Sequence, residues 1–129
     1  MTPTFKLEYL IDNGIDDDGN GYIDDFFGYN FSYIKDGSEA DYTYNPYDAH
    51  GTNVAGIAAA TTNNNTGIAG VAYNCRFFPI KTATNPGRSI IYGYESILYA
   101  AERGLKVLNC SWGSVKPFSE IDQSIINYA

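Results

Sequence analysis

From residue 50 onward the chain alternates helix-like and strand-like segments, and this alternation constrains the fold more than any other feature. The helix-like segments and the strand-length apolar runs between them are, in chain order, 50–62, 75–81, 89–104, 105–110 and a last helix from Ser119. Strands that alternate with helices run parallel and are covered by the helices, which defines the α/β class. Parallel strands are buried on both faces and need neighbours on both edges, so two of them make an incomplete three-layer fold. We therefore expect residues 1–129 to be the central piece of a larger α/β domain.

The helix at 89–104 has the clearest periodicity. Its apolar residues fall on one helical face, namely Ile90, Tyr94, Ile97, Leu98 and Ala101. The last helix begins with Ser119 and Asp122 at the spacing of a weak capping box. Its predicted buried stripe consists of Ile121, Ile125 and Tyr128. Residues 1–48 instead read as loops and short strands, with 26–31 as the strand-like stretch.

Composition excludes several classes of protein. The 129 residues are 44% hydrophobic, enough for the core of one domain and too apolar for a disordered chain. No apolar run approaches the roughly 20 residues of a membrane-spanning helix. The net charge of −7 and a pI near 4.4 argue against nucleic acid as a partner. Two cysteines, Cys75 and Cys110, cannot form a disulfide framework, and both are predicted to be buried in strands.

Charge is concentrated in the first part of the chain, which points to a cation. Residues 1–50 hold 11 acidic and two basic side chains, whereas residues 51–129 hold four acidic and six basic ones. Within 16–25 the spacing resembles a calcium loop of the EF-hand type. The predicted oxygen donors are Asp16, Asp18, Asn20, the carbonyl of Tyr22, and Asp25.

Two other features of this loop fit the hypothesis, and one departs from it. Gly21 permits the sharp turn, and Ile23 is expected to anchor the loop in the core. The position at which an EF-hand has its closing Glu is Phe27, so we expect a shorter loop closed by Asp25, with Asp24 as the alternate. The competing interpretation is a solvated acidic turn, which is disfavoured because five neighbouring carboxylates repel one another. A bound Ca²⁺ would be structural.

His50 is the single histidine and the main candidate for chemistry. A lone histidine is more often a packing or capping residue than a catalyst, but the helix that follows it has little side-chain bulk. Such a helix can approach another element closely and hold an imidazole at its first turn in a fixed place. A general base needs that placement and a near-neutral pKa.

The stretch His50–Gly56, HGTNVAG, resembles the histidine motif H-G-T-x-V-A-G of the subtilisin-like serine proteases, or subtilases. Ala49 stands where that family usually has Gly, and Asn53 where a second His is frequent. Further matches follow in family order. They are the acidic insertion at 13–31, the strand segment at 68–81 and the [IVL]-N-x-S-[WFL]-G segment at 108–113.

The resemblance implies a role for each matched residue. His50 would be the general base of a Ser-His-Asp triad that hydrolyses peptide bonds. Ser111, Trp112 and Gly113, within the 105–114 strand and pocket segment, would line the substrate pocket and pair with an extended peptide. Without the family, Trp112 would read as a core residue at a strand end. Gly87–Ser89 is an uncertain opposite wall of the groove, and family habit suggests secretion or a cell-surface location.

The family's remaining triad members have no match. No apolar strand ending in D-[ST]-G and no G-T-S-M-A string occurs, and Asp12 lies in a loop context. We therefore expect a fragment of a calcium-stabilised serine endopeptidase that is inactive and poorly soluble alone, its partners being peptide substrates and the missing parts of its own domain. The alternative is a non-enzymatic calcium-binding remnant or pseudo-protease. A metallohydrolase built on His50 and Asp48 is rejected, because zinc sites need three or four ligands.

Overall fold

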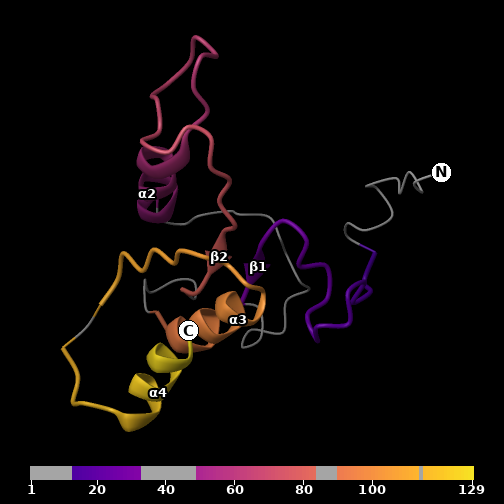
Figure 1. Cartoon of the computed structure of the whole chain (residues 1–129), viewed down its shortest axis with the longest axis vertical. Coiled ribbons are helices and arrows are strands. Elements are labelled where there is room, and N and C mark those ends of the chain that lie inside the picture. Colours follow the sequence, from indigo (N-terminus) through magenta and orange to yellow (C-terminus); the bar gives the residue numbers. More distant parts are fainter. Residues whose placement is uncertain (1–12, 33–48, 84–89, 114) are drawn as a thin grey trace.

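The computed structural model describes residues 13–32, 49–83, 90–113 and 115–129. In chain order its elements are β1 (Tyr29–Asn30), α2 (His50–Ala59), β2 (Ile80–Lys81), α3 (Gly93–Glu102) and α4 (Glu120–Tyr128) (Figure 1). Every helix in the described ranges is too short or too polar to cross a lipid bilayer. The mixture of a parallel sheet with helices agrees with the predicted α/β class.

The sheet consists of two short parallel strands, and it is smaller than predicted. Tyr29 pairs with Ile80 and Asn30 with Lys81. The predicted strands 26–31 and 75–81 therefore pair over two residues each, and the predicted strand at 105–110 has no strand pairing in the described structure. The two strands are parallel, as the α/β class requires, but β2 pairs with β1 and not with the predicted strand at 105–110. The predicted lengths are wrong because an apolar run becomes a strand only where a neighbour accepts its hydrogen bonds.

The core lies where α3 meets β1 and the acidic loop. Its buried apolar residues are Phe31, Ile97, Tyr99 and Ala100. Tyr99 lies 1% exposed, and its ring contacts those of Tyr22, Tyr29 and Phe31 with centroids 4.6–5.6 Å apart. These edge-on and tilted aromatic contacts hold the loop, the strand and the helix together.

Helix α3 is shorter than predicted and buries a partly different face. The residues it buries are Gly93, Ser96, Ile97, Tyr99 and Ala100, so of the predicted face only Ile97 is fully buried. Ile90 and Ile91 lie before the helix, because Ile90 forms a bridge with Ala83 and the Ile91 N–H donates to the Thr82 carbonyl. Tyr99 lies outside the predicted apolar stripe and is buried because its ring packs in the aromatic cluster.

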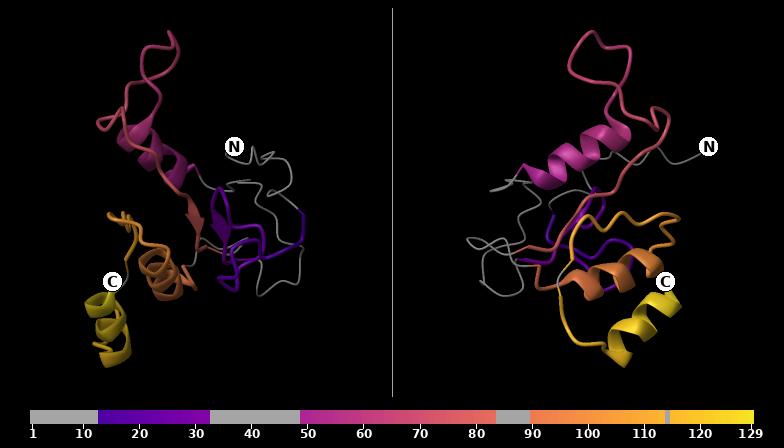
Figure 2. Two further views of the ribbon diagram at one scale, coloured as in Figure 1. Left: turned by 45° about the vertical axis from the view of Figure 1, so that its right-hand side comes forward. Right: turned by 90° about the vertical axis from the view of Figure 1, so that its left-hand side faces the viewer.

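Helix α2 ends three residues earlier than predicted and is closed by the chain that follows it. Ala60 has extended backbone angles, and its carbonyl accepts the Gly70 N–H, while Val71 and Ala72 donate to the last turn. A Cβ on Gly70 would lie 2.4 Å from the Ala60 nitrogen, so the close approach requires glycine there. The small-residue helix therefore does permit close packing. Figures 1 and 2 show α2 and its 61–69 loop standing away from α3 and α4.

Helix α4 begins as predicted but does not bury its predicted stripe. The Ser119 side chain accepts the Asp122 N–H, which is the expected N-cap. Ile121 and Tyr128 are exposed and Ile125 is half-buried, because the described part of the chain covers α4 only from the side of α3 (Figure 2).

The two cysteines, Cys75 and Cys110, are exposed, contrary to prediction, since neither lies in a strand.

Candidate functional site

His50 lies at the first position of α2 with its side chain exposed. Its Nε2 is 2.9 Å from the carbonyl oxygen of Ser111, which is 61 positions away in sequence. A carbonyl oxygen only accepts hydrogen bonds, so the imidazole Nε2 is the donor in this contact. The fold thus brings together two segments that the sequence analysis had assigned to one site.

The Ser111–Gly113 segment is placed by contacts on both of its sides. On one side the Asn109 amide donates to the Ser111 hydroxyl at 2.8 Å. On the other side the Trp112 ring meets the Tyr94 ring edge-on at 6.2 Å. A Cβ on Gly93 would lie 2.7 Å from the indole, so the absence of a side chain there lets Trp112 pack against α3.

The predicted site residues therefore divide into described and undescribed ones. His50, Ser111, Trp112 and Gly113 are described, and the first two are in direct contact. Trp112 is half-buried: one side of its ring packs against α3, and the rest of the side chain is accessible. Ser114 and Gly87–Ser89 lie outside the described residues, as do Asp12 and Asp48.

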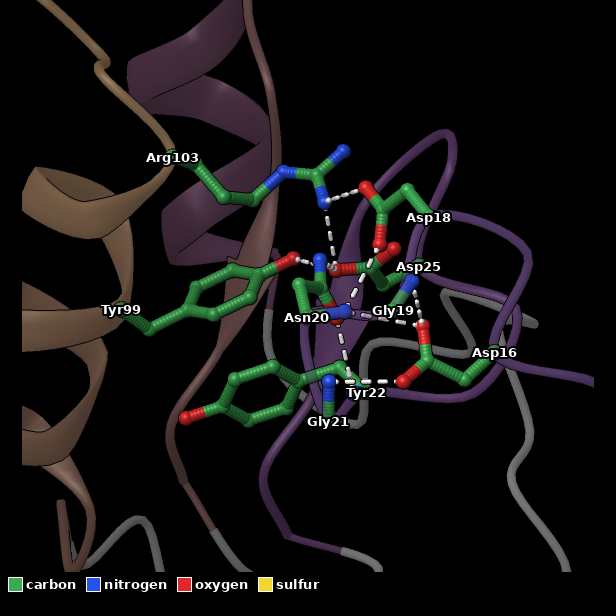
Figure 3. Close-up of polar contacts among 9 residues, drawn as sticks. All are labelled: Asp16, Asp18, Gly19, Asn20, Gly21, Tyr22, Asp25, Tyr99 and Arg103. Carbon is green, nitrogen blue, oxygen red and sulfur yellow. Dashed lines mark hydrogen bonds and ion pairs between the residues drawn. The ribbon is translucent and has the colours of Figure 1, made fainter.

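The acidic loop curls around Asp16. Its carboxylate accepts the backbone N–H groups of Gly19, Asn20 and Gly21 at 2.7–3.1 Å (Figure 3). The Gly21 bond is the largest of the effects that hold the pKa of Asp16 below its ordinary value. Asn20 closes the turn further, because its Oδ1 accepts the Tyr22 N–H at 2.8 Å.

Asp25 joins this loop to α3, which the sequence analysis did not foresee. Its Oδ2 accepts from the Tyr99 hydroxyl at 2.6 Å, from Arg103 Nη1 at 2.7 Å and from Asn20 Nδ2 at 2.9 Å (Figure 3). Arg103 also reaches Asp18 at 3.2 Å. Burial and the hydrogen bond to Asp25 raise the pKa of the Tyr99 hydroxyl, which therefore stays protonated and donates. The guanidinium supplies positive charge to a loop that otherwise carries only carboxylates.

The predicted calcium donors are of the right chemical type, but other groups of the chain already engage them. A cavity of about 260 Å³ lies beside Arg103, lined by Asp17, Asp18, Asp24, Asp25, Phe26 and Arg103. Among the described residues no three His, Cys, Asp or Glu side chains are placed so that they could hold a metal ion. Ile23 does not anchor the loop as predicted: it is exposed, and the ring of Tyr22 packs on Tyr99 instead. The contact of Arg103 with this loop could have been anticipated from one feature of the sequence, because five neighbouring carboxylates need a positive charge beside them.

Comparison with known proteins gives the family. The model of the subtilase family matches residues 10–128. A thermophilic serine proteinase from Bacillus sp. (strain AK1) is 37% identical over 126 residues, which cover 93% of this chain and 29% of that protein. Thermitase from Thermoactinomyces vulgaris is 41% identical over 83 residues, or 64% of this chain and 29% of thermitase. The halolysin-like extracellular serine protease Nep of Natrialba magadii is 30% identical over 109 residues, or 81% of this chain and 20% of that protein.

The chain thus spans less than a third of the length of these relatives. No solved structure matches it significantly. The names of these relatives describe proteases, so the comparisons do not favour the non-enzymatic alternative. With nearly its whole length matched by the family model, this chain belongs to the subtilase family.

Proposed function

We propose that this chain supplies the general base and part of the substrate groove of a subtilisin-like serine endopeptidase. The observation that supports the proposal best is the 2.9 Å contact between His50 Nε2 and the Ser111 carbonyl. It joins the histidine motif to the segment expected to bind substrate, and it leaves the imidazole at the surface, where a hydroxyl can reach it.

In the proposed reaction, His50 removes the proton from a serine hydroxyl as that oxygen attacks the peptide carbonyl. The imidazolium then returns the proton to the leaving amine, and an acyl-enzyme is formed and hydrolysed. Nε2 must be unprotonated to accept the serine proton, so the ring has to release the Ser111 carbonyl before it acts. The nucleophile's G-T-S-M-A string is absent from residues 1–129, so we place the serine in another part of the enzyme.

The proposed substrate is an extended peptide or an unfolded protein. Ser111 and Gly113 are exposed, and the described part of the 105–113 segment pairs with no strand. Backbone groups in this state can add a peptide as a further strand, while Trp112 offers an apolar surface to one of its side chains. Secretion is proposed as well, and it is supported by the name of the extracellular relative Nep.

Ca²⁺ is the proposed structural ligand of the 16–25 loop. Asp16, Asp18, Asn20, the Tyr22 carbonyl and Asp25 are oxygen donors of the kind that this cation prefers. Because Arg103 contacts both Asp18 and Asp25, we expect the guanidinium and Ca²⁺ to compete. Isothermal titration should then show tighter Ca²⁺ binding by Arg103→Ala than by the unaltered chain. Equal affinities, or no binding by either protein, would contradict this proposal.

The catalytic proposal is tested by restoring the missing parts. The chain is expressed alone and, separately, joined to the flanking parts of the Bacillus thermophilic serine proteinase, and hydrolysis of unfolded casein is measured. We expect no cleavage above background by the chain alone and cleavage by the joined protein. In subtilisin, loss of the triad histidine lowers kcat about 2 × 10⁶-fold, and we expect His50→Ala to lower the joined protein's activity comparably.

The matched control is Asn53→Ala, which alters an exposed side chain of the same helix and should leave activity within about twofold of the unaltered protein. Two results would overturn the proposal. One is a joined protein that melts cooperatively but is inactive. The other is activity that survives His50→Ala.

A further inference from the structure

The Ser111 carbonyl can meet His50 only if the backbone at residue 111 is held in one orientation. The segment 105–113 has no helix or strand among the described residues, and Val107, Asn109, Cys110 and Ser111 are all exposed. Regular backbone hydrogen bonding therefore does not fix the direction of this carbonyl. Some other contact must restrict it, because a free residue samples several backbone conformations.

Asn109 provides such a contact. Its Nδ2 donates to the Ser111 Oγ at 2.8 Å. The backbone carbonyl of Ser111 in turn lies 2.9 Å from His50 Nε2. The Asn109–Ser111 bond closes a small ring across Cys110 and limits rotation on both sides of residue 110. The two hydrogen bonds thus form a short series in which the Asn109 amide orients Ser111 and Ser111 orients the imidazole.

We propose that Asn109 is a positioning residue for His50 in its resting state, acting through Ser111. The ring leaves this contact when Nε2 accepts a proton. Asn109 does not touch the imidazole, and its effect on catalysis rests on the proposed function. Its effect on the state of His50 does not, because that state is measurable without turnover. Trp112, packed against Gly93, restrains the far side of the same segment, so loss of Asn109 should loosen the Ser111 carbonyl without releasing the whole segment.

The first test uses the reactivity of the one histidine. Diethylpyrocarbonate acylates imidazole nitrogens that hold a free lone pair, and peptide mass spectrometry reads the rate at His50. With the full chain in dilute solution, Asn109→Ala and Ser111→Ala should each raise this rate about two- to tenfold, as expected for the loss of one hydrogen bond. The double variant should react no faster than either single variant, because the two residues act in series.

Two variants serve as controls. Ser111→Thr keeps a hydroxyl and should react like the unaltered chain. Asn127→Ala removes the acceptor of the Gln123 amide in α4 and should leave the His50 rate unchanged. Equal rates for Asn109→Ala and the unaltered chain would overturn the proposal, as would rates that multiply in the double variant.

The second test is spectroscopic and identifies a change that simple loosening of the fold would not mimic. A single histidine gives one pair of imidazole ¹⁵N signals, and their positions report which nitrogen carries the hydrogen. We expect Nε2 to be protonated in the neutral ring of the unaltered chain and of Ser111→Thr. Asn109→Ala should shift the signals towards a mixture of the two tautomers at an unchanged far-ultraviolet circular dichroism spectrum.

Identical ¹⁵N signals in all variants would contradict a positioning role. Activity separates this inference from the proposed function. If Asn109→Ala alters His50 but the joined protease never cleaves casein, the positioning role stands and the proposed function fails.

Discussion

The acidic loop with α3 and the histidine helix with the 105–113 segment are built in opposite ways. The buried apolar residues named in the core lie in α3 or directly after β1, where the rings of Tyr99 and Phe31 contact each other. Helix α2 buries none of its residues, and one side-chain hydrogen bond connects His50 to Ser111. The buried apolar residues of the described part of this chain therefore lie outside the two segments of the proposed chemistry, which contact the core helix α3 through Trp112.

A physical reason for this division is the demand that catalysis makes on a surface. A general base and a peptide-binding backbone must stay accessible, so they cannot lie in a packed interior. The acidic loop has no such demand, and its charges are compensated by Tyr99 and Arg103 from α3. Three pairs of substitutions and one single substitution test whether this contrast holds.

The same truncation in the two helices should have the largest effect and the sharpest contrast. Ile97 in α3 is 5% exposed, whereas Ile57 in α2 is 62% exposed. We expect Ile97→Ala to lower the free energy of unfolding by about 2–5 kcal/mol because it leaves a cavity. Ile57→Ala should change it by about 0.5 kcal/mol or less. Urea unfolding followed by circular dichroism measures both, and similar losses of stability in the two variants would contradict the difference in burial.

The two ion pairs should differ for the same reason. Arg103 meets a nearly buried Asp25, and its loss leaves that carboxylate without its guanidinium partner. We expect Arg103→Ala to cost about 1–3 kcal/mol. Lys116 pairs with Asp122 but has a side chain 45% exposed, so Lys116→Ala should cost less than about 1 kcal/mol. Thermal melts at low and high salt measure both losses of stability, and we expect salt to weaken only the Lys116–Asp122 pair. A salt-sensitive Arg103 pair would count against its burial.

Two glycines offer a smaller contrast. A Cβ on Gly93 would clash with the Trp112 ring, whereas a Cβ on Gly51 would meet open space. Since Trp112 is half-buried and can move, we expect Gly93→Ala to cost about 1 kcal/mol and to shift the fluorescence of this one tryptophan to longer wavelength. Gly51→Ala should be neutral or stabilise α2 by about 0.5–1 kcal/mol. An unshifted emission maximum in Gly93→Ala would show that the indole does not pack there.

The smallest effect is expected from Asp16 and depends on pH. The pKa of its carboxyl is lowered from 3.8, chiefly by the Gly21 N–H. Its ionised form therefore stabilises the folded loop above that pH, and the stabilisation is lost as the pH falls through the folded pKa. Asp16→Asn should be less stable than the unaltered chain near neutral pH, and the difference should shrink on acidification below about pH 4. A stability difference that is constant with pH would contradict this assignment.

Local signals in the sequence predicted local structure well. The Ser119 cap and the histidine at the start of a helix were both foreseen, because each depends on a few neighbouring residues. The parallel direction of the strands was expected from element order, but the strand that pairs with β2 was not. The centre of α3 was also correct. Its true buried face was not, because Tyr99 is selected by aromatic residues from the distant β1.

Apart from the meeting of His50 with Ser111, which the family resemblance implied, contacts between distant residues could not be predicted. No spacing rule connects Arg103 with Asp25, since their sequence separation of 78 is set by the fold alone. The exposure of Cys75 and Cys110 was missed for a related reason: their apolar neighbours looked like strands, but no partner strand pairs with them in the described structure. The Asn109 contact is local, but its meaning emerges only once His50 is found beside Ser111.

The pairing of Tyr29 with Ile80 has a consequence for the order of folding. The two strands come from distant points of the chain, and the whole histidine helix lies in the loop that their pairing closes. Loop closure of this length is entropically slow, so this sheet should form late, after α2 and α3 have found their local hydrogen bonds. During synthesis on a ribosome, α2 would emerge and form its helix before β2 had been made to pair with β1.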